Sequence, residues 1–211
     1  MIKPGLDPAT TALLLIDLQN DVLHPKGAYG RAGYNDGAVS ALPRRLAPIA
    51  TGLRDRGGWV IATHFTILEG KGGAPIISDH LHQMRPFLAR GDFQRGQWGH
   101  ALVDELGPAD LHVDKFAFSA FYMTPLEWML RHIKVDTLLI AGLTTPISVL
   151  TSLRDALLRD FRGFVLEDGV AAFDQRQHRA ALAEMSRMAP VRTCDFVHDM
   201  LRGPPVLKAA S

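Results

Sequence analysis

The chain has 211 residues, 47% of them hydrophobic, which is enough to bury the core of one large α/β domain. Its 23 basic and 22 acidic residues leave a net charge of +1, so it lacks the strong field that attracts nucleic acid or anionic lipid, and a small-molecule partner is favoured. The single cysteine, Cys194, excludes an intrachain disulfide and favours a cytoplasmic location.

Short apolar blocks recur along the chain, each with the length and composition of a strand buried in a parallel sheet. The first, ALLLI at 12–16, is followed directly by Asp17. Residues 1–11 before it are too polar for a secretory signal, and no apolar run reaches the length of a membrane span, so we expect no membrane contact. The later blocks are WVIAT at 59–63, TLLIAGL at 137–143, FVLE at 164–167 and, more weakly, DLHVDK at 110–115 and VRTC at 191–194.

The segments between these blocks carry hydrophobic residues at helical spacing. Residues 38–56 end at two glycines, which suit a helix C-terminus, and TPLE at 124–127 has the spacing of a capping box that opens a helix to about residue 133. Further helices are predicted over 147–161 and 175–188. Strands that alternate with helices predict a three-layer, doubly wound α/β fold with a mostly parallel sheet and helices on both faces.

Two stretches without a clear period, residues 26–37 and 69–97, are predicted to be loops. The second is long enough to form a lid over a functional site. We expect one domain over residues 1–211, with a loose tail at 203–211.

Three polar residues stand where strands end, and ligands of open α/β sheets bind beyond the carboxyl ends of the strands. Asp17 follows the first block, Lys115 ends DLHVDK, and Ser148 lies in GLTTPISVLT, where Thr145 suits the N-cap and Pro146 the first helical position. Taken singly, they also fit a turn aspartate, a surface lysine and a serine that satisfies free N–H groups. Together they form a base, an electrostatic stabiliser and a nucleophile at a helix N-terminus.

The segments ALLLIDLQND, VDKFAFSAF, GLTTPISVLTSLRDALLRDF and VLEDG resemble the isochorismatase-like hydrolases. This superfamily includes nicotinamidases, N-carbamoylsarcosine amidase, ureidoacrylate amidohydrolase and biuret hydrolase. The similarity runs from about Thr11 to Phe173. It implies hydrolysis of the C–N bond of a small amide, ureide or carbamoyl compound, without a cofactor, by a homodimer or homotetramer.

The resemblance assigns catalytic roles to Asp17, Lys115 and residue 148, but the family nucleophile is a cysteine and this chain has Ser148. Cys194 is expected on a late strand, far from the motif. A serine hydroxyl is a much weaker acid than a thiol and usually needs a better base than an aspartate beside a lysine.

Several explanations of this serine stay open. The chain could be an engineered Cys-to-Ser variant, or a natural member that works without a thiol, as isochorismatases do on a vinyl ether. A vinyl-ether hydrolase would need cations to bind the carboxylates of its substrate. Arg85, Arg90 and Arg95 could supply them if they face the cleft. Serine could also be the true nucleophile, or the chain could be a non-catalytic metabolite-binding protein, whose pocket would be filled by side chains.

The resemblance also implies an oxyanion hole made by the backbone N–H groups of Thr144 and Ser148, with a cis peptide bond between Leu143 and Thr144. Nicotinamidases bind a metal through an Asp-x-His motif after the second strand. Here the sequence is Thr63, His64 and Phe65, so no metal site is expected. Candidate substrate contacts, chosen because they lie near strand ends or in aromatic-rich loops, are Gln19, His64, Trp98 and Phe118.

Overall fold

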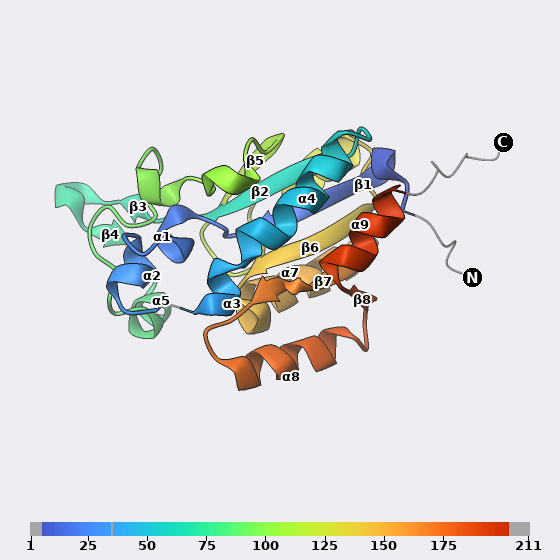
Figure 1. The fold of residues 1–211 in the computed structure, drawn as a ribbon. Coiled ribbons are helices and arrows are strands. Elements are labelled where there is room, and N and C mark those ends of the chain that lie inside the picture. Colours follow the sequence, from blue (N-terminus) through green and yellow to red (C-terminus); the bar gives the residue numbers. More distant parts are fainter. Residues whose placement is uncertain (1–5, 35, 203–211) are drawn as a thin grey trace.

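A parallel sheet forms the centre of the computed structural model, which describes residues 6–34 and 36–202 (Figure 1). Within these residues the sheet has six strands in the order β5-β2-β1-β6-β7-β8. All neighbouring strands are parallel, and β1 lies inside the sheet with every residue buried. The strands are β1 (Thr11–Ile16), β2 (Trp59–Phe65), β5 (Leu111–Lys115), β6 (Thr137–Leu143), β7 (Arg162–Ala171) and β8 (Val191–Arg192).

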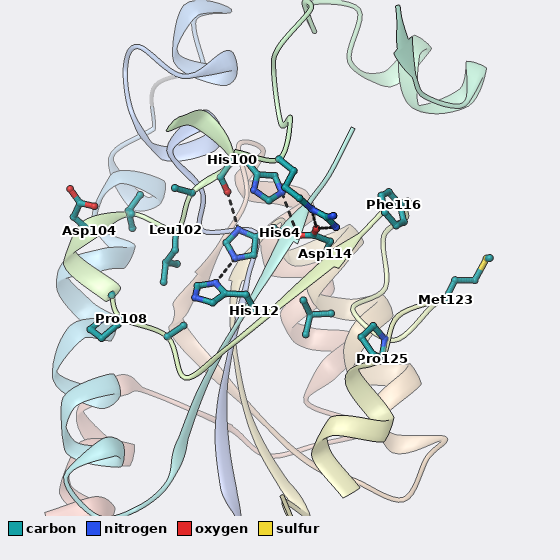
Figure 2. Close-up of a pocket in the computed structure, with 16 residues that line it drawn as sticks. His64, His100, Leu102, Asp104, Pro108, His112, Asp114, Phe116, Met123 and Pro125 are labelled. Carbon is teal, nitrogen blue, oxygen red and sulfur yellow. Dashed lines mark hydrogen bonds and ion pairs between the residues drawn. The ribbon is translucent and has the colours of Figure 1, made fainter. Parts of the chain in front are cut away.

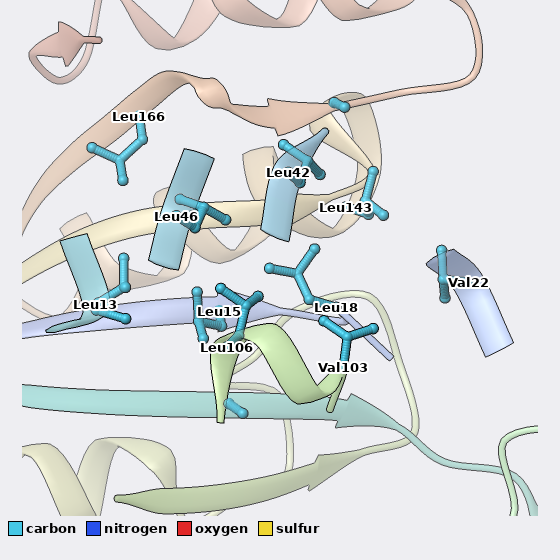
Figure 3. Packing of buried hydrophobic residues seen from close by; sticks show 14 of the residues in the cluster. Leu13, Leu15, Leu18, Val22, Leu42, Leu46, Val103, Leu106, Leu143 and Leu166 are labelled. Carbon is cyan, nitrogen blue, oxygen red and sulfur yellow. The ribbon is translucent and has the colours of Figure 1, made fainter. Parts of the chain in front are cut away.

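Helices cover both faces of the sheet, and alternate residues of β1 point to the two layers. Leu13 and Leu15 pack with α4 (Figure 3) and with α9 on one face. Leu14 and Ile16 pack with α6, α7 and α8 on the other. The predicted three-layer α/β fold is confirmed. The helices are α1 (Asn20–Leu23), α2 (Ala28–Arg31), α3 (Gly37–Ser40), α4 (Leu42–Arg54), α5 (Asp79–Met84), α6 (Leu126–His132), α7 (Leu150–Leu157), α8 (Gln175–Met185) and α9 (Cys194–Arg202).

The C-terminal part differs from the prediction. The block VRTC forms only the short strand β8, and Cys194 begins helix α9 rather than lying on a strand. Helix α9 was missed, although its buried Val197 and Leu201 pack beside α4. The predicted helix 38–56 is divided into α3 and α4, and the predicted helix 147–161 begins with a π-helical turn, Thr145–Val149, before α7.

The two predicted loops contain short elements. Residues 26–37 include α2, and residues 69–97 include α5 together with β4 (Pro75–Ile76), which pairs antiparallel with β3 (Leu68–Glu69). The predicted tail, 203–211, lies outside the described residues, and the single-domain organisation stays a prediction. None of the helices in the described part of the chain is long and apolar enough to cross a membrane.

Replacement of Gly142 by alanine is expected to destabilise the fold by about 3 kcal/mol or more. Gly142 has a φ of +121°, and a Cβ atom there would lie 2.1 Å from the backbone oxygen of Ile16 in the neighbouring strand. Urea unfolding measures the change. Gly37→Ala is the matched control, because a Cβ at Gly37 meets nothing within 4 Å, and equal effects at both positions would contradict the prediction.

Candidate active site

The predicted catalytic residues lie at one edge of the sheet. Asp17 directly follows β1, Lys115 is the last residue of β5, and Ser148 lies in the π-helical turn after β6. Because these strands are parallel, their carboxyl ends face the same way, and all three side chains line one pocket. The structure therefore brings the three residues together, and their catalytic roles stay a prediction.

Asp17 has a backbone conformation that is uncommon for residues other than glycine. Its φ is +56°, and its amide donates a hydrogen bond to the carbonyl of Thr63 at 3.2 Å. The hydroxyl of Thr63 in turn donates to Oδ1 of Asp17 at 3.1 Å. Such conformations cluster at functional sites, where the surrounding structure enforces them. Here Thr63 holds the side chain of Asp17, which is only 9% exposed.

Lys115 reaches Asp17 across the intervening strand β2. Two strand spacings separate β5 from β1, a span of roughly 10 Å, and Nζ of Lys115 lies 2.7 Å from Oδ2 of Asp17 and 5.7 Å from the centre of the Phe65 ring. Only a long side chain can make this contact.

The ammonium group of Lys115 has protein partners for all three of its donors. Besides Asp17, Nζ donates to the carbonyls of Ala117 at 3.0 Å and Phe118 at 3.1 Å. Burial lowers the pKa of Lys115, and the charge of Asp17 opposes that shift. Its N–H donors are therefore all engaged, and what the lysine presents to the pocket is a positive charge.

Ser148 is the fourth residue of the turn Thr145–Val149, which leads into α7. The turn begins one residue earlier than expected, with Thr144 rather than Thr145 at the N-cap, and the carbonyl of Thr144 accepts from Ile147 and Val149. The peptide bond between Leu143 and Thr144 is cis, as the resemblance implied. Ser148 is buried, so its hydroxyl is shielded from bulk water.

The pocket around these residues is small in this conformation. The rings of Tyr29, Phe65 and Phe93 form much of its wall. The free space is about 20 Å³, which is enough for about one water molecule. Three lining residues, Arg85, Phe118 and Thr144, are half-buried and the others are buried, so the pocket meets solvent on their side. A substrate enters only if a side chain there moves.

Of the four predicted substrate contacts, Phe118 lines this pocket and the other three do not. Gln19 is fully buried and bonds to both backbone groups of Phe65 and to the carbonyl of His100, which makes it a brace between segments. Trp98 is 52% exposed and contacts the ring of His24 edge-on. A position near a strand end or in an aromatic-rich loop did not fix the direction of these side chains.

His64 lines a different and larger cavity of about 940 Å³ (Figure 2). Its Nε2 lies 2.9 Å from Nδ1 of His112, and its Nδ1 lies 2.9 Å from the carbonyl of His100. Asp17, Lys115 and Ser148 do not line this cavity. No group of three or more side chains suited to hold a metal ion was found in the described ranges. We take the smaller pocket as the candidate active site, because its charged and polar groups converge.

Acidification is expected to destabilise the fold through His100. Burial lowers the pKa of His100 from its usual 6.5 to about 4, whereas the unfolded chain takes up this proton near pH 6.5. The unfolded state therefore binds more protons between these values, and the free energy of unfolding falls by about 3 kcal/mol as the pH drops through them. The measurement is urea unfolding across this range. His100→Gln should weaken the dependence of the unfolding free energy on pH. His82→Gln, at an exposed histidine of α5, is the control and should leave that dependence unchanged. The same pH dependence in all three proteins would refute the assignment to His100.

Several lining residues were missed or given another role by sequence reasoning. Tyr29 and Phe93 come from the two segments without periodicity. Asp21 links these segments, because its carboxylate accepts from the amide of Ala28 at 3.1 Å and from that of Phe93 at 2.7 Å. The polar run after β1 was a signal for such a link, but its partners could not be found from spacing.

Comparison with known sequences matches the chain to one family model and to relatives that share one name. Residues 11–195 match the family model described as an isochorismatase domain. The chain is 35% identical to "Ureidoacrylate amidohydrolase RutB" of Methylobacterium radiotolerans over 196 residues, which cover 86% of this chain and 75% of the relative. It is 31% identical to the protein of the same name from Caulobacter vibrioides over 176 residues, 77% of each chain.

Solved structures share the fold. A cysteine hydrolase from Pseudomonas syringae superposes with a TM-score of 0.80 at 22% identity, covering 96% of this chain and 99% of that one. N-carbamoylsarcosine amidase from Thermoplasma acidophilum superposes with a TM-score of 0.68 at 24% identity, covering 88% and 97%. At these identities the likeness concerns the fold alone.

Proposed function

Because the chain belongs to the isochorismatase family, we propose that it is a hydrolase of a small amide, ureide or carbamoyl compound, which cleaves a non-peptide C–N bond. The relatives named as ureidoacrylate amidohydrolases support this class of substrate. The observation that carries the proposal is the buried ion pair of Asp17 and Lys115, 2.7 Å long, in the same pocket as Ser148. A carboxylate, an ammonium and a nucleophile position are the groups that acyl transfer requires.

In the proposed reaction, Asp17 takes the proton of the nucleophile at position 148, which attacks the carbonyl carbon of the substrate. The backbone N–H groups of Thr144 and Ser148 stabilise the resulting oxyanion. Collapse of this intermediate breaks the C–N bond, and the proton held by Asp17 goes to the leaving ammonia or amine. Water then releases the acyl group and restores the side chain at position 148.

Lys115 contributes by its charge. It stabilises the ionised form of Asp17 before the reaction and the negative charge that develops on the substrate during it. With serine at position 148, we expect turnover of C–N substrates to be slow, because the hydroxyl is a weak acid for this base.

Two competing hypotheses are less well supported. Vinyl-ether hydrolysis of a dicarboxylate would require several cations in the pocket. Arg90 pairs with Glu69 and Arg95 with Asp114 outside the pocket, so of these three arginines Arg85 alone lines it.

The second hypothesis is a non-catalytic binding protein, and the small free space of the pocket is what such a protein would show. A pocket closed only for packing, however, would be expected to contain apolar groups rather than a buried ion pair and an arginine.

We further propose that the hydrolase acts in the cytoplasm as a homodimer or homotetramer. The lone, buried Cys194 supports the location, and the assembly is what the resemblance described above implies.

The test is ammonia release from a panel of primary amides, ureides and carbamoyl amino acids, with a vinyl-ether acid assayed in parallel. Both the chain and its Ser148→Cys variant are measured. Turnover of C–N substrates supports the proposal. Turnover of the vinyl ether alone, or of nothing in either form, would contradict it.

A further inference from the structure

Arg85 extends from the end of α5 into the candidate active site. Its guanidinium carbon lies 5.2 Å from the centre of the Phe65 ring and 6.0 Å from that of Tyr29. Both rings belong to the wall of the pocket that contains Asp17 and Ser148. The aromatic faces therefore hold a delocalised cation against the space where a substrate would lie.

The charge of Arg85 is not balanced within the pocket. The other ionised lining residues, Asp17 and Lys115, pair with each other. In residues 6–34 and 36–202, no carboxylate forms an ion pair with Arg85, although Arg31, Arg90 and Arg95 of neighbouring segments all have such partners. The pocket thus carries one net positive charge.

Two polar atoms of the pocket also lack hydrogen-bond partners. Across the described ranges, the buried side-chain nitrogen and oxygen atoms without a partner are Nη1 of Arg85 and Oγ1 of Thr144, and both residues line this pocket. Leaving such atoms unpaired in the interior is costly, and structures retain them where a ligand or a function explains them. A ligand with a negatively charged acceptor near Arg85 and a polar group near Thr144 would satisfy both.

We propose that Arg85 binds a carboxylate of the substrate and thereby selects small amides or ureides that carry one. The planar fork of a guanidinium matches the two oxygens of a carboxylate, and the pair is strongest where water is excluded. Arg85 is half-buried at the solvent side of the pocket. It can therefore move aside to admit the acid and then close on its carboxylate, while the scissile carbonyl lies at Ser148. This inference rests on the proposed function, because it assigns the substrate class of the same site.

Binding to the serine-bearing chain tests the proposal without requiring turnover. The probes are N-carbamoyl-β-alanine and its primary amide, which have nearly the same shape and differ by one charge. Isothermal titration should show the acid binding on the order of 100-fold more tightly than the amide, as expected for a charge-assisted, bidentate contact. Arg85→Met should remove this preference by weakening the acid alone, and Arg85→Lys should restore part of it.

Arg90→Met is the matched control, because Arg90 lies in the same segment but pairs with Glu69 outside the pocket. It should keep the full preference for the acid. The proposal would be overturned by equal binding of both probes, or by an Arg85→Met variant that binds the acid as tightly as the starting protein. It would also be overturned if the acid did not bind at millimolar concentration. If the preference is found while the Ser148→Cys variant hydrolyses nothing, the proposed function fails and the carboxylate site stands.

Discussion

Ser148→Cys is expected to raise the rate of ammonia release from a suitable amide or ureide by ~10³-fold or more. The change replaces a hydroxyl by a thiol of nearly the same shape, at a buried position in the first turns of a helical segment and in one pocket with Asp17. Amides at a helix start favour the thiolate, and a carboxylate is then a sufficient base. The measurement is kcat/KM for each compound of the panel.

Two further variants control for the new thiol. Ser148→Ala should be inert, because it removes any nucleophile from the pocket. Cys194→Ser in the Ser148→Cys background should leave the activity unchanged, because Cys194 is buried in α9 outside the pocket and burial raises the pKa of its thiol. If the cysteine form and the serine form are equally inert across the panel, the covalent mechanism is wrong. Equal and substantial activity of both forms would instead identify serine as a working nucleophile.

Asp17→Ala is expected to lower the free energy of unfolding by about 3 kcal/mol or more, because it leaves the fully buried ammonium of Lys115 without its partner. In the Ser148→Cys background it should also reduce kcat/KM by ~10³-fold, since the proposed base is lost. Urea unfolding and the ammonia assay give the two values. The conservative Asp17→Asn separates charge from shape, and it should lose the activity as well.

The double variant Asp17→Ala/Lys115→Met separates stability from catalysis. Removing both charges should bring the stability back to within about 1 kcal/mol of the starting protein, because a buried ion pair contributes little relative to apolar groups of similar volume. The activity should not return. A stability loss of less than about 1 kcal/mol for Asp17→Ala alone would show that Lys115 finds water or another acceptor, and would contradict the closed pocket.

Local sequence patterns determined the strands of the sheet and the position of the candidate active site at their carboxyl ends. The apolar blocks became strands β1, β2, β6 and β7, and the weaker block that ends at Lys115 became β5. The polar residues at their carboxyl ends line one pocket, because parallel strands in one sheet end on the same side. Each of these patterns spans only a few residues, so it can be recognised in the sequence without knowing which residues pack against it.

Tertiary structure decided which side chains point into the pocket. His64 follows the alternation of β2 into the larger cavity, and Gln19 turns inward to bond with Phe65. Arg85, Tyr29 and Phe93 reach the site from segments with no periodic pattern, which are drawn together by contacts such as those of Asp21. Their positions depend on contacts between residues far apart in the chain, and spacing along a single sequence carries no record of such contacts.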